Sequence, residues 1–217
     1  MPHARLPKHS LTSVAVVAAV LYCSWPLGSL LNPIANRGLA SNLEAIGQPW
    51  NWLFTLLDII CGGLVVWLAW QLYMTIKRPR KQWLLLTAII GFGLFGLLNA
   101  ADAFLPIDCV PTAMKCRPAL QDPYFVAHGI ASIASTNGLT ITIVALWWIF
   151  LRSRQAPRLL RWTLNVTMVV WFSFGVGTGV LILLDRSSAL SQHVFIVVCS
   201  LLIASLPHLV SRARSYS

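Results

Sequence analysis

Charged residues are scarce in this sequence, and acidic residues are the scarcest of them. Asp, Glu, Lys and Arg together make up 10% of the 217 residues, and Glu44 is the only glutamate. A soluble domain carries about 25% charged residues, which cover the surface that faces water. The hydrophobic fraction of 57% and the mean hydropathy of +0.72 agree with this shortage. The composition therefore argues against a soluble globular protein and predicts a membrane protein.

The five cysteines form no Cys-x-x-Cys pair, so a redox-active dithiol motif has no support. Cys109 and Cys116 share the short segment CVPTAMKC, which we expect to lie in a loop outside the cytoplasm. The outer face of a bacterial plasma membrane can be oxidising, so these two residues are candidates for a disulfide. Cys23, Cys61 and Cys199 lie in apolar segments, where we expect them to be buried as small hydrophobic side chains.

Long apolar segments dominate the rest of the chain. Each is long enough to cross roughly 30 Å of hydrocarbon, which takes about 20 helical residues. Each must be helical, because lipid offers no partner for a free backbone N–H or C=O group. The first is expected to stay uncleaved, since no small-x-small cleavage site follows it. The predicted fold class is an all-α membrane protein, one six-helix domain over residues 1–217 with two polar extracytoplasmic loops. The predicted spans are 11–31, 52–76, 83–105, 125–151, 162–184 and 190–210.

The distribution of Lys and Arg predicts the orientation of these spans. The net charge of +10 lies in clusters between apolar segments, and such a pattern favours positive-inside topology over nucleic-acid binding. With both termini cytoplasmic, twelve of the sixteen basic residues lie inside, in a plasma (inner) membrane. The inner residues are Arg5, Lys8, Lys77, Arg78, Arg80, Lys81, Arg152, Arg154, Arg158, Arg161, Arg212 and Arg214, and the outer ones are Arg37, Lys115, Arg117 and Arg186.

All six acidic residues fall on the opposite, outer side of this topology. Asp58 is the most informative of them, because it lies inside the second apolar segment, in LFTLLDIICGG. A carboxylate that meets lipid costs about 2.5–3.5 kcal/mol on insertion scales, so Asp58 must face the bundle interior and pair, or be protonated. An ionisable group at such a position suggests a functional site. The alternative is an interhelical hydrogen bond that only fixes packing.

The segment SNLEAIGQPWNW, residues 41–52, interrupts the apolar runs with polar and turn-forming residues. Ser41 is a candidate N-cap, and Glu44 three positions later completes a capping box for a short interfacial helix. On that interpretation Glu44 is a cap and the loop over residues 32–50 covers the bundle. The alternative is that Glu44 or Gln48 faces a polar site. Trp50 is expected to anchor the start of the second span at the membrane interface.

Polar residues also gather at the outer ends of the later spans. Asp102 lies near the end of the third span, and His128 and Ser132 share one face of the fourth because they are four residues apart. Asp185 ends the fifth span and His193 begins the sixth. We therefore expect one outer polar cluster.

His128 is the candidate general base in this cluster, with Asp102 or Asp58 orienting its ring. Ser132 is a weaker candidate nucleophile, because one helical turn separates it from His128 and no elbow motif surrounds it. The candidate catalytic residues are His128, Asp102, Asp58 and Ser132, and the candidate substrate-binding residues are Glu44, Gln48, Trp50, Asp185 and His193.

Three parts of the sequence together resemble a known family. They are S-x-L-E-A-x-G-Q-P-W-x-W-L-F over 41–54, D-x-x-L-P-x-D-C over 102–109 with a second cysteine following, and H-G-x-A-S over 128–132. This combination resembles an uncharacterised prokaryotic family catalogued as domain of unknown function 998, and the resemblance covers nearly the whole chain. It implies a six-helix plasma-membrane protein. It implies no reaction, because the family is named for lacking one.

Three classes of function are compatible with these features. The first is a site in the outer leaflet that binds or modifies a lipid or envelope component, as a hydrolase or transferase if it is an enzyme. The second is a non-catalytic accessory subunit of a membrane complex, which the small residues Gly175 and Gly179 on one helix favour. The third is a small-solute transporter, which is weaker because no pair of broken helices appears at mid-membrane.

The expected partners follow from these classes. They are membrane lipids, with another membrane protein as the second candidate and no nucleic acid. Zinc held by Asp102, His128 and His193 would activate water, but only two histidines lie at this depth, so we expect no metal and identify no cofactor.

The predicted orientation can be tested by labelling. We expect a cysteine placed in the basic turn 77–81 to react with a membrane-impermeant thiol reagent only after cells are opened, because the turn is predicted to be cytoplasmic. A cysteine placed in the segment 32–50 is expected to react in intact cells. Labelling of the 77–81 turn in intact cells would contradict this orientation.

Overall fold

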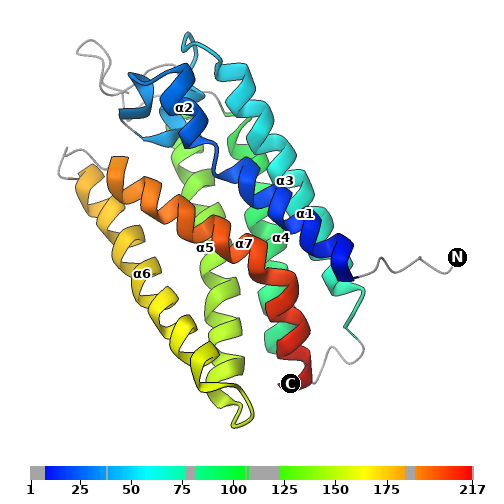
Figure 1. The fold of residues 1–217 in the computed structure, drawn as a ribbon. Helices are drawn as coiled ribbons and strands as arrows, with labels where there is room; N and C mark the ends of the chain where they lie inside the picture. The colour runs from blue at the N-terminus through cyan, green and yellow to red at the C-terminus, as the bar shows by residue number, and fades with distance from the viewer. Residues whose placement is uncertain are drawn as a thin grey trace, which may run out of the picture.

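The computed structural model describes residues 8–37, 39–76, 82–105, 107, 123–183 and 189–216, and their regular structure is entirely helical (Figure 1). This confirms the all-α prediction for the part of the chain that the structure describes. The α-helices are α1 (Lys8–Tyr22), α2 (Trp25–Leu31), α3 (Asn51–Tyr73), α4 (Trp83–Asp102), α5 (Pro123–Arg152), α6 (Arg158–Leu183) and α7 (Ala189–Tyr216). Two 3₁₀ turns, η1 (Ala35–Arg37) and η2 (Ala40–Leu43), lie between α2 and α3.

Five helices, α3 to α7, are each long and apolar enough to cross a membrane. They correspond to the five later spans predicted from the sequence, although α7 continues six residues beyond the predicted end at residue 210. The chain is therefore a multi-pass membrane protein by length and composition. A sixth span exists only if α1 and α2 are taken together, and these two helices are bent by 42° at their junction.

The prediction of one continuous helix over 11–31 is wrong, because the helix breaks between Tyr22 and Trp25. Pro26 explains the break. It has no backbone N–H, and its ring would clash with the carbonyl of the residue four positions earlier in a continuing helix. It is tolerated in the first turn of α2, where an N–H would have no helical partner.

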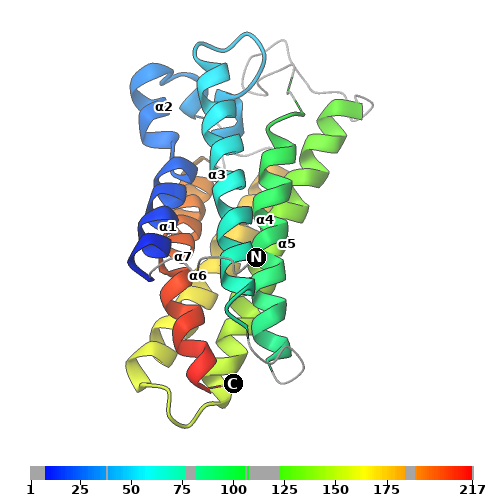
Figure 2. The same cartoon turned by 90° about the vertical axis from the view of Figure 1, so that its right-hand side faces the viewer.

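Helices α3, α4 and α5 lie side by side and antiparallel, and α4 packs on both of its neighbours. Helix α1 packs on α3 and α7, while α6 packs mainly on α7 (Figure 2). The most deeply buried side chains include Phe92, Phe95 and Phe150, from α4 and α5. Only 11% of the most apolar stretch of α6 is buried, against 56% for α7. Helix α6 therefore leaves most of its surface to its surroundings.

Glycines allow α3, α4 and α5 to approach closely. A Cβ atom added at Gly62 would lie 2.4 Å from the backbone oxygen of Gly96, so α3 and α4 touch through their backbones there. A Cβ atom at Gly91 would lie 2.7 Å from the backbone oxygen of Gly138, which brings α4 against α5 in the same way. Such small-residue contacts are typical of helices that pack within membranes.

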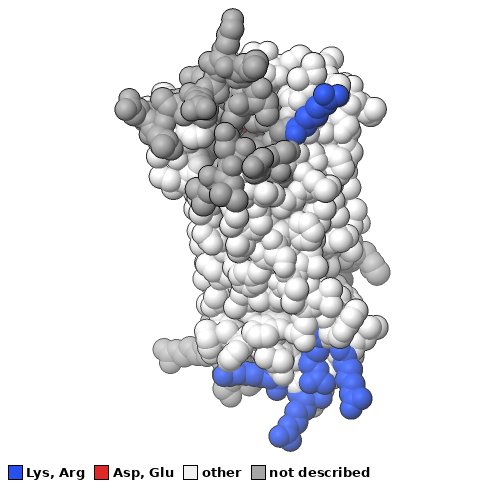
Figure 3. Space-filling view, turned by 90° about the vertical axis from the view of Figure 1, so that its left-hand side faces the viewer, with Lys and Arg blue, Asp and Glu red and all other residues white. Residues whose placement is uncertain are grey.

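Most of the described basic residues and all of the described acidic residues lie at opposite ends of the bundle (Figure 3). The end with the α5–α6 turn and the C-terminus carries arginines, including Arg152, Arg161 and Arg214, and Figure 3 shows Lys and Arg gathered mainly there. We call it the basic end. The described acidic residues, Glu44, Asp58 and Asp102, lie at the opposite end, where α3 begins and α4 ends, and we call it the acidic end.

Neighbouring glycines in α3 provide a matched test of this packing. We expect Gly62→Ala to destabilise the protein by about 1–3 kcal/mol, because the added methyl group overlaps the backbone of α4. We expect Gly63→Ala to be neutral or slightly stabilising, because no atom lies within 4 Å of the added Cβ. The unfolding temperature of the purified protein in detergent measures both. Equal losses in the two variants would contradict the proposed close approach.

Candidate functional site

The acidic end brings together side chains from three helices and the loop that covers them. Asp58 lies in α3, Asp102 ends α4, and His128 and Ser132 lie near the start of α5. Glu44 comes from the loop between α2 and α3. Five of the predicted polar residues thus pair with partners from other elements. Asp102 pairs with His128 and Ser132, and Asp58 pairs with Glu44.

His128 is held by one ring nitrogen and is almost fully buried. Its Nδ1 atom lies 3.1 Å from the backbone oxygen of Leu105 and 3.1 Å from Asp102 Oδ1. A carbonyl oxygen can only accept a hydrogen bond, so Nδ1 carries the proton that it donates to Leu105. In the neutral ring, Nε2 is then the nitrogen with the free lone pair, and this atom can accept a proton.

Asp102 connects His128 to Ser132. The Ser132 hydroxyl donates a hydrogen bond of 2.5 Å to Asp102 Oδ2. Asp102 Oδ1 is buried and, among the described residues, has no aligned hydrogen-bond donor, although His128 Nδ1 lies near it. The carboxylate therefore orients the imidazole electrostatically and retains one acceptor oxygen. Because the Ser132 hydroxyl points to Asp102 and not to His128, the geometry does not prepare Ser132 as a nucleophile.

Glu44 forms a hydrogen bond with Asp58 through their side chains. Two carboxyl groups can share such a bond only if one of them is protonated. Burial raises the pKa of Glu44 well above its usual range, and the negative charge of Asp58, the hydrogen bond to Asp58 and the charge of Asp102 raise it further. Glu44 is therefore the protonated partner, and its carboxyl group donates to Asp58.

The predicted capping box at Ser41 and Glu44 is wrong. The 3₁₀ turn η2 begins after Leu39 and includes Ser41, while Glu44 ends it. The side chain of Glu44 forms its hydrogen bond with Asp58 and not with a backbone N–H group at the start of a helix. The alternative derived from the sequence, that Glu44 faces a polar site, describes its position.

Backbone contacts between helices hold Asp58 and Asp102 near each other. Gly62, one turn below Asp58, touches the backbone of α4 at Gly96. On the same face of α4, Asn99 Nδ2 donates to the backbone oxygen of Asp58 at 3.1 Å. The glycine contact thus sets the separation of α3 and α4, and Asn99 fixes their register. Nothing in the local sequence around Asn99 indicates this partner across the helix pair.

Hydroxyl groups of α5 bind backbone oxygens of α4 and so fix the register between these two helices. Ser135 Oγ donates to the backbone oxygen of Phe95 at 3.2 Å, and Thr142 Oγ1 donates to that of Ala88 at 3.0 Å. Together with Ser132 they form a stripe along one face of α5 that packs against α4. The rigid pairing of these helices positions His128 over Asp102.

The loop over the cluster is fixed at several points. Asn32 Nδ2 donates to Gln48 Oε1 at 3.0 Å, which closes the loop across its two ends. The Ile46 N–H donates to the backbone oxygen of Ile107 at 2.9 Å, and Ala45 and Ile107 are buried together. The predicted site residue Gln48 therefore has a partner within the loop.

Trp50 lies at the rim of the cluster and forms the N-cap of α3 in a left-handed conformation with φ of 65°. Its side chain is 47% exposed. A left-handed conformation is unfavourable for a residue with a Cβ atom, so neighbouring contacts must hold it there.

His193 belongs to a different group of contacts. Its ring stacks on Trp25 of α2, with centroids 4.4 Å apart and an angle of 8° between the rings. The neighbouring Gln192 accepts a hydrogen bond of 2.6 Å from the backbone of Ala40. These contacts join α7 to the start of the loop and not to the Asp102–His128 pair in the part of the chain that the structure describes.

Three predicted residues, Asp185, Cys109 and Cys116, lie outside the described residues. Within the described ranges, no three His, Cys, Asp or Glu side chains are arranged to hold a metal ion. The three described cysteines, Cys23, Cys61 and Cys199, are free thiols. Cys61 and Cys199 are buried, as expected from their apolar segments, whereas Cys23 is partly exposed.

Sequence reasoning missed Tyr22 at the inner edge of the cluster. Its hydroxyl is hydrogen-bonded to Cys199 and lies within electrostatic reach of Asp58. Its ring packs edge-on against Phe95 at 5.3 Å. The only local signal was a tyrosine at the end of an apolar run, next to the Pro26 break.

Comparison with known proteins gives one match. The model of a family described as "Protein of unknown function (DUF998)" matches residues 13–207. No curated protein and no solved structure matches the chain.

The Glu44–Asp58 pair predicts a pH dependence of stability. In the unfolded chain Glu44 titrates near 4.5, whereas in the folded protein its pKa is raised, so the folded state keeps this proton to higher pH. The corresponding stability is complete below the unfolded value and is lost as the pH rises through the folded-state pKa. We expect Glu44→Gln, which stays neutral and still donates, to flatten this decline.

Thermal unfolding in detergent between about pH 4 and about pH 9 measures the slope for both proteins. If wild type and Glu44→Gln lose stability equally with rising pH, Glu44 does not carry the shared proton.

Proposed function

Because the chain belongs to the DUF998 family, whose description states no activity, we propose a function from its own site: it binds a lipid or lipid-borne envelope component at the acidic end and transfers a proton there through His128. A hydrolase or a transferase is the reaction class. The outer leaflet of the plasma membrane is the proposed location. The observation that carries this proposal is the pairing of the buried His128 with Asp102, in which the protonated Nδ1 is fixed and Nε2 is left as the basic atom.

The pair has the parts that general base catalysis requires. A base must be held in one tautomer and orientation, and the Leu105 carbonyl and Asp102 do this from one side of the ring. Asp102 also stabilises the imidazolium that forms when Nε2 takes a proton.

Among the residues that the structure describes, Ser132 is the serine beside His128, and it is not prepared as a nucleophile, which favours water or a substrate hydroxyl in that role. Ser132 donates its proton to Asp102, so His128 would activate a group that is not covalently part of the described site. His128 would remove the proton of that group as it attacks, and would return the proton to the leaving oxygen. This sequence of steps conserves protons and needs no metal or redox partner.

The position of the pair supports a lipid substrate. It lies at the ends of three membrane-crossing helices, so a molecule that reaches it from the side is already in the bilayer. The loop with Glu44 overhangs it, and the exposed Trp50 and Trp52 lie at the start of α3, at a depth that suits amphipathic rings. We assign Glu44 and Trp50 to substrate binding, and His193, through its stack on Trp25, to positioning the loop.

A non-catalytic accessory subunit is the second candidate, and the exposure of α6 favours it. Only 11% of its most apolar stretch is buried within the chain, and no atom lies within 4 Å of a Cβ added at Gly179. A helix of another membrane protein would cover this face. In that case the polar cluster at the acidic end would serve packing only.

Lipid profiling of cells that carry single variants separates the two candidates. We expect His128→Gln to alter the lipid profile as deletion of the gene does, because loss of a general base reduces the rate by about 10²–10⁴-fold. Asp102→Asn should give the same change. The matched control is His208→Gln, on an exposed position of α7, which should leave the profile unchanged.

Variants must be compared at equal protein amount and equal unfolding temperature. A deletion strain with an altered profile, beside a His128→Gln strain with the wild-type profile, would refute the proposed chemistry and favour the accessory role.

A further inference from the structure

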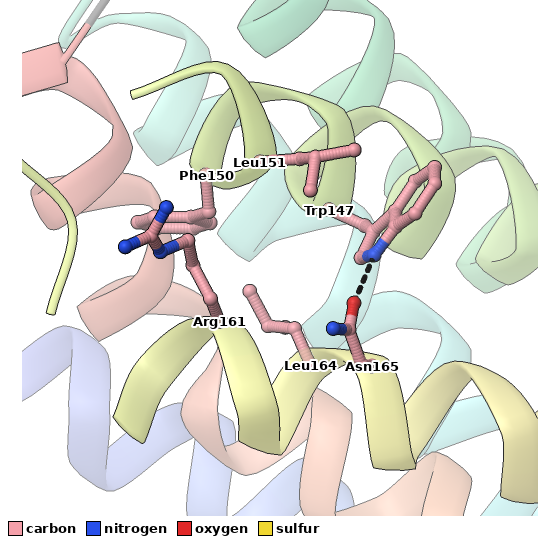
Figure 4. Close-up of a pocket in the computed structure, with 6 residues that line it drawn as sticks. All are labelled: Trp147, Phe150, Leu151, Arg161, Leu164 and Asn165. Carbon is pink, nitrogen blue, oxygen red and sulfur yellow. Dashed lines mark hydrogen bonds between the residues drawn. The ribbon is translucent and has the colours of Figure 1, made fainter. Parts of the chain in front are cut away.

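In the proposed function a substrate must reach the ring of His128, which is almost fully buried. Helix α5, which carries this residue, is fixed along its length. Hydroxyl groups bind it to α4, and at the basic end Trp147 Nε1 donates to Asn165 Oδ1 of α6 at 2.7 Å (Figure 4). We therefore expect access to depend on the loop at the acidic end, at residues 44–46, which we call the lid segment.

The lid segment contacts the chain that follows α4 and the start of α5. The Ile46 N–H donates to the backbone oxygen of Ile107 at 2.9 Å. Ala45 is buried together with Ile107, and Phe125 of α5 packs against both. Phe125 lies three residues before His128 on the same face of the helix. The lid segment is therefore beside His128.

The lid segment is also connected to the group that orients His128. Leu105 accepts the hydrogen bond from His128 Nδ1. Ile107, to which Ile46 donates, lies two residues further along the chain. Displacement of the lid segment would therefore remove a constraint on the Leu105 carbonyl as well as a neighbour of the ring.

The lid segment lies between a fixed residue and a flexible one. Leu43, before it, is 1% exposed and packs on Phe54 of α3. Gly47, after it, has φ of 81°, a left-handed conformation that glycine adopts without strain. No atom lies within 4 Å of a Cβ built at Gly47. The segment can thus move about Gly47 while the turn η2 stays packed on the bundle.

The contact between Glu44 and Asp58 depends on a proton, because two ionised carboxyl groups have none to share and repel each other. Asp58 of α3 and Asp102 of α4 act electrostatically on Glu44, and both are acidic. Around them, Tyr22 of α1 lies within reach of Asp58, and His128 of α5 pairs with Asp102. Within the described ranges, no lysine or arginine forms an ion pair with Glu44 that would stabilise its charge.

We propose that Glu44 is a proton-operated latch on the site at His128: its protonated carboxyl group holds the lid segment on Asp58, and its ionisation releases the segment. Burial, and then the nearby Asp58 and Asp102, raise the pKa of Glu44 in the folded protein. The latch is therefore closed at low pH and opens as the pH rises through this folded-state pKa. As regulation of access, the latch rests on the proposed function, which gives His128 its role.

Modification of His128 by diethyl pyrocarbonate tests the latch without any lipid substrate. The reagent acylates accessible neutral imidazole rings, and peptide mass spectrometry gives a separate rate for each histidine of the purified full-length protein. Wild type and Glu44→Gln are compared at equal pH, between about pH 5 and about pH 9. His208, which is exposed on α7, is the internal control in every sample.

We expect equal His128 rates in the two proteins at the acid limit. At the alkaline limit, wild type should react roughly fivefold to tenfold faster, because loss of a hydrogen bond shifts an opening equilibrium by about this factor. Glu44→Gln stays latched, because its amide donates to Asp58 at every pH. Asp58→Asn should also stay latched, because its amide donates to an ionised Glu44 and accepts from a protonated one.

Equal His128 rates in wild type and Glu44→Gln at every pH would overturn the latch. A rise with pH that persists in Asp58→Asn would also overturn it, because another group would then open the site. Gln48→Ala removes the contact with Asn32 but no charge, so it should keep the wild-type response. A response lost in Gln48→Ala would show that any change in the loop abolishes it, and would refute the latch. If Glu44→Gln is destabilised, Asp58→Asn decides the test.

The latch and the proposed chemistry fail separately. A pH-dependent His128 rate, beside an unchanged lipid profile in His128→Gln cells, would support the latch and refute the chemistry. An altered lipid profile beside a His128 rate that is equal in wild type and Glu44→Gln would refute the latch alone.

Discussion

A carboxyl group inside a membrane-crossing helix must find a hydrogen-bond partner, and this requirement determines how the acidic end is built. Asp58 finds its partner in Glu44, which the chain can supply only by folding the loop between α2 and α3 over the bundle. The Asn32–Gln48 hydrogen bond and the Ile46–Ile107 contact hold the loop in that position. The only glutamate of the sequence is therefore part of a tertiary contact, and the loop is a structural element of the site.

The same constraint explains which parts of the structure could be predicted from the sequence. Spans follow from hydropathy because lipid requires helices, and the Asp102–His128–Ser132 group follows from helix ends and a spacing of four residues. The Glu44–Asp58 pair could not be predicted from the sequence. The spacing of Ser41 and Glu44 fits a capping box, and nothing in the same segment indicates that Glu44 instead binds the distant Asp58. The bend at Pro26 had a local signal, but the length of the apolar run favoured one continuous helix. His193 shares a depth with His128, yet its stack on Trp25 depends on where α2 turns.

Charge separation between the two ends gives each end a different chemistry. At the acidic end, the carboxyl groups are half-buried, and Asp102 meets an imidazole and a hydroxyl, so protons are held at defined atoms. At the basic end, arginines lie at the surface and meet indole rings, as Arg152 does on Trp148. The apolar helices between the ends hold close-packed glycine contacts and few polar groups. Among the five long apolar helices, α6 leaves the largest part of its surface on the outside of the bundle.

Burial at the acidic end also limits the reactions that the pair can support. His128 is buried and Asp102 is half-buried, so the attraction between an imidazolium and the carboxylate is stronger there than at a surface. In the proposed function, a hydroxyl or water that enters this environment would meet His128 Nε2 as the basic nitrogen. Because Ser132 is occupied with Asp102, a covalent serine intermediate would first require that hydrogen bond to break. In the proposed function, direct attack by water or by a second hydroxyl requires no such rearrangement and is therefore the simpler reaction for this geometry.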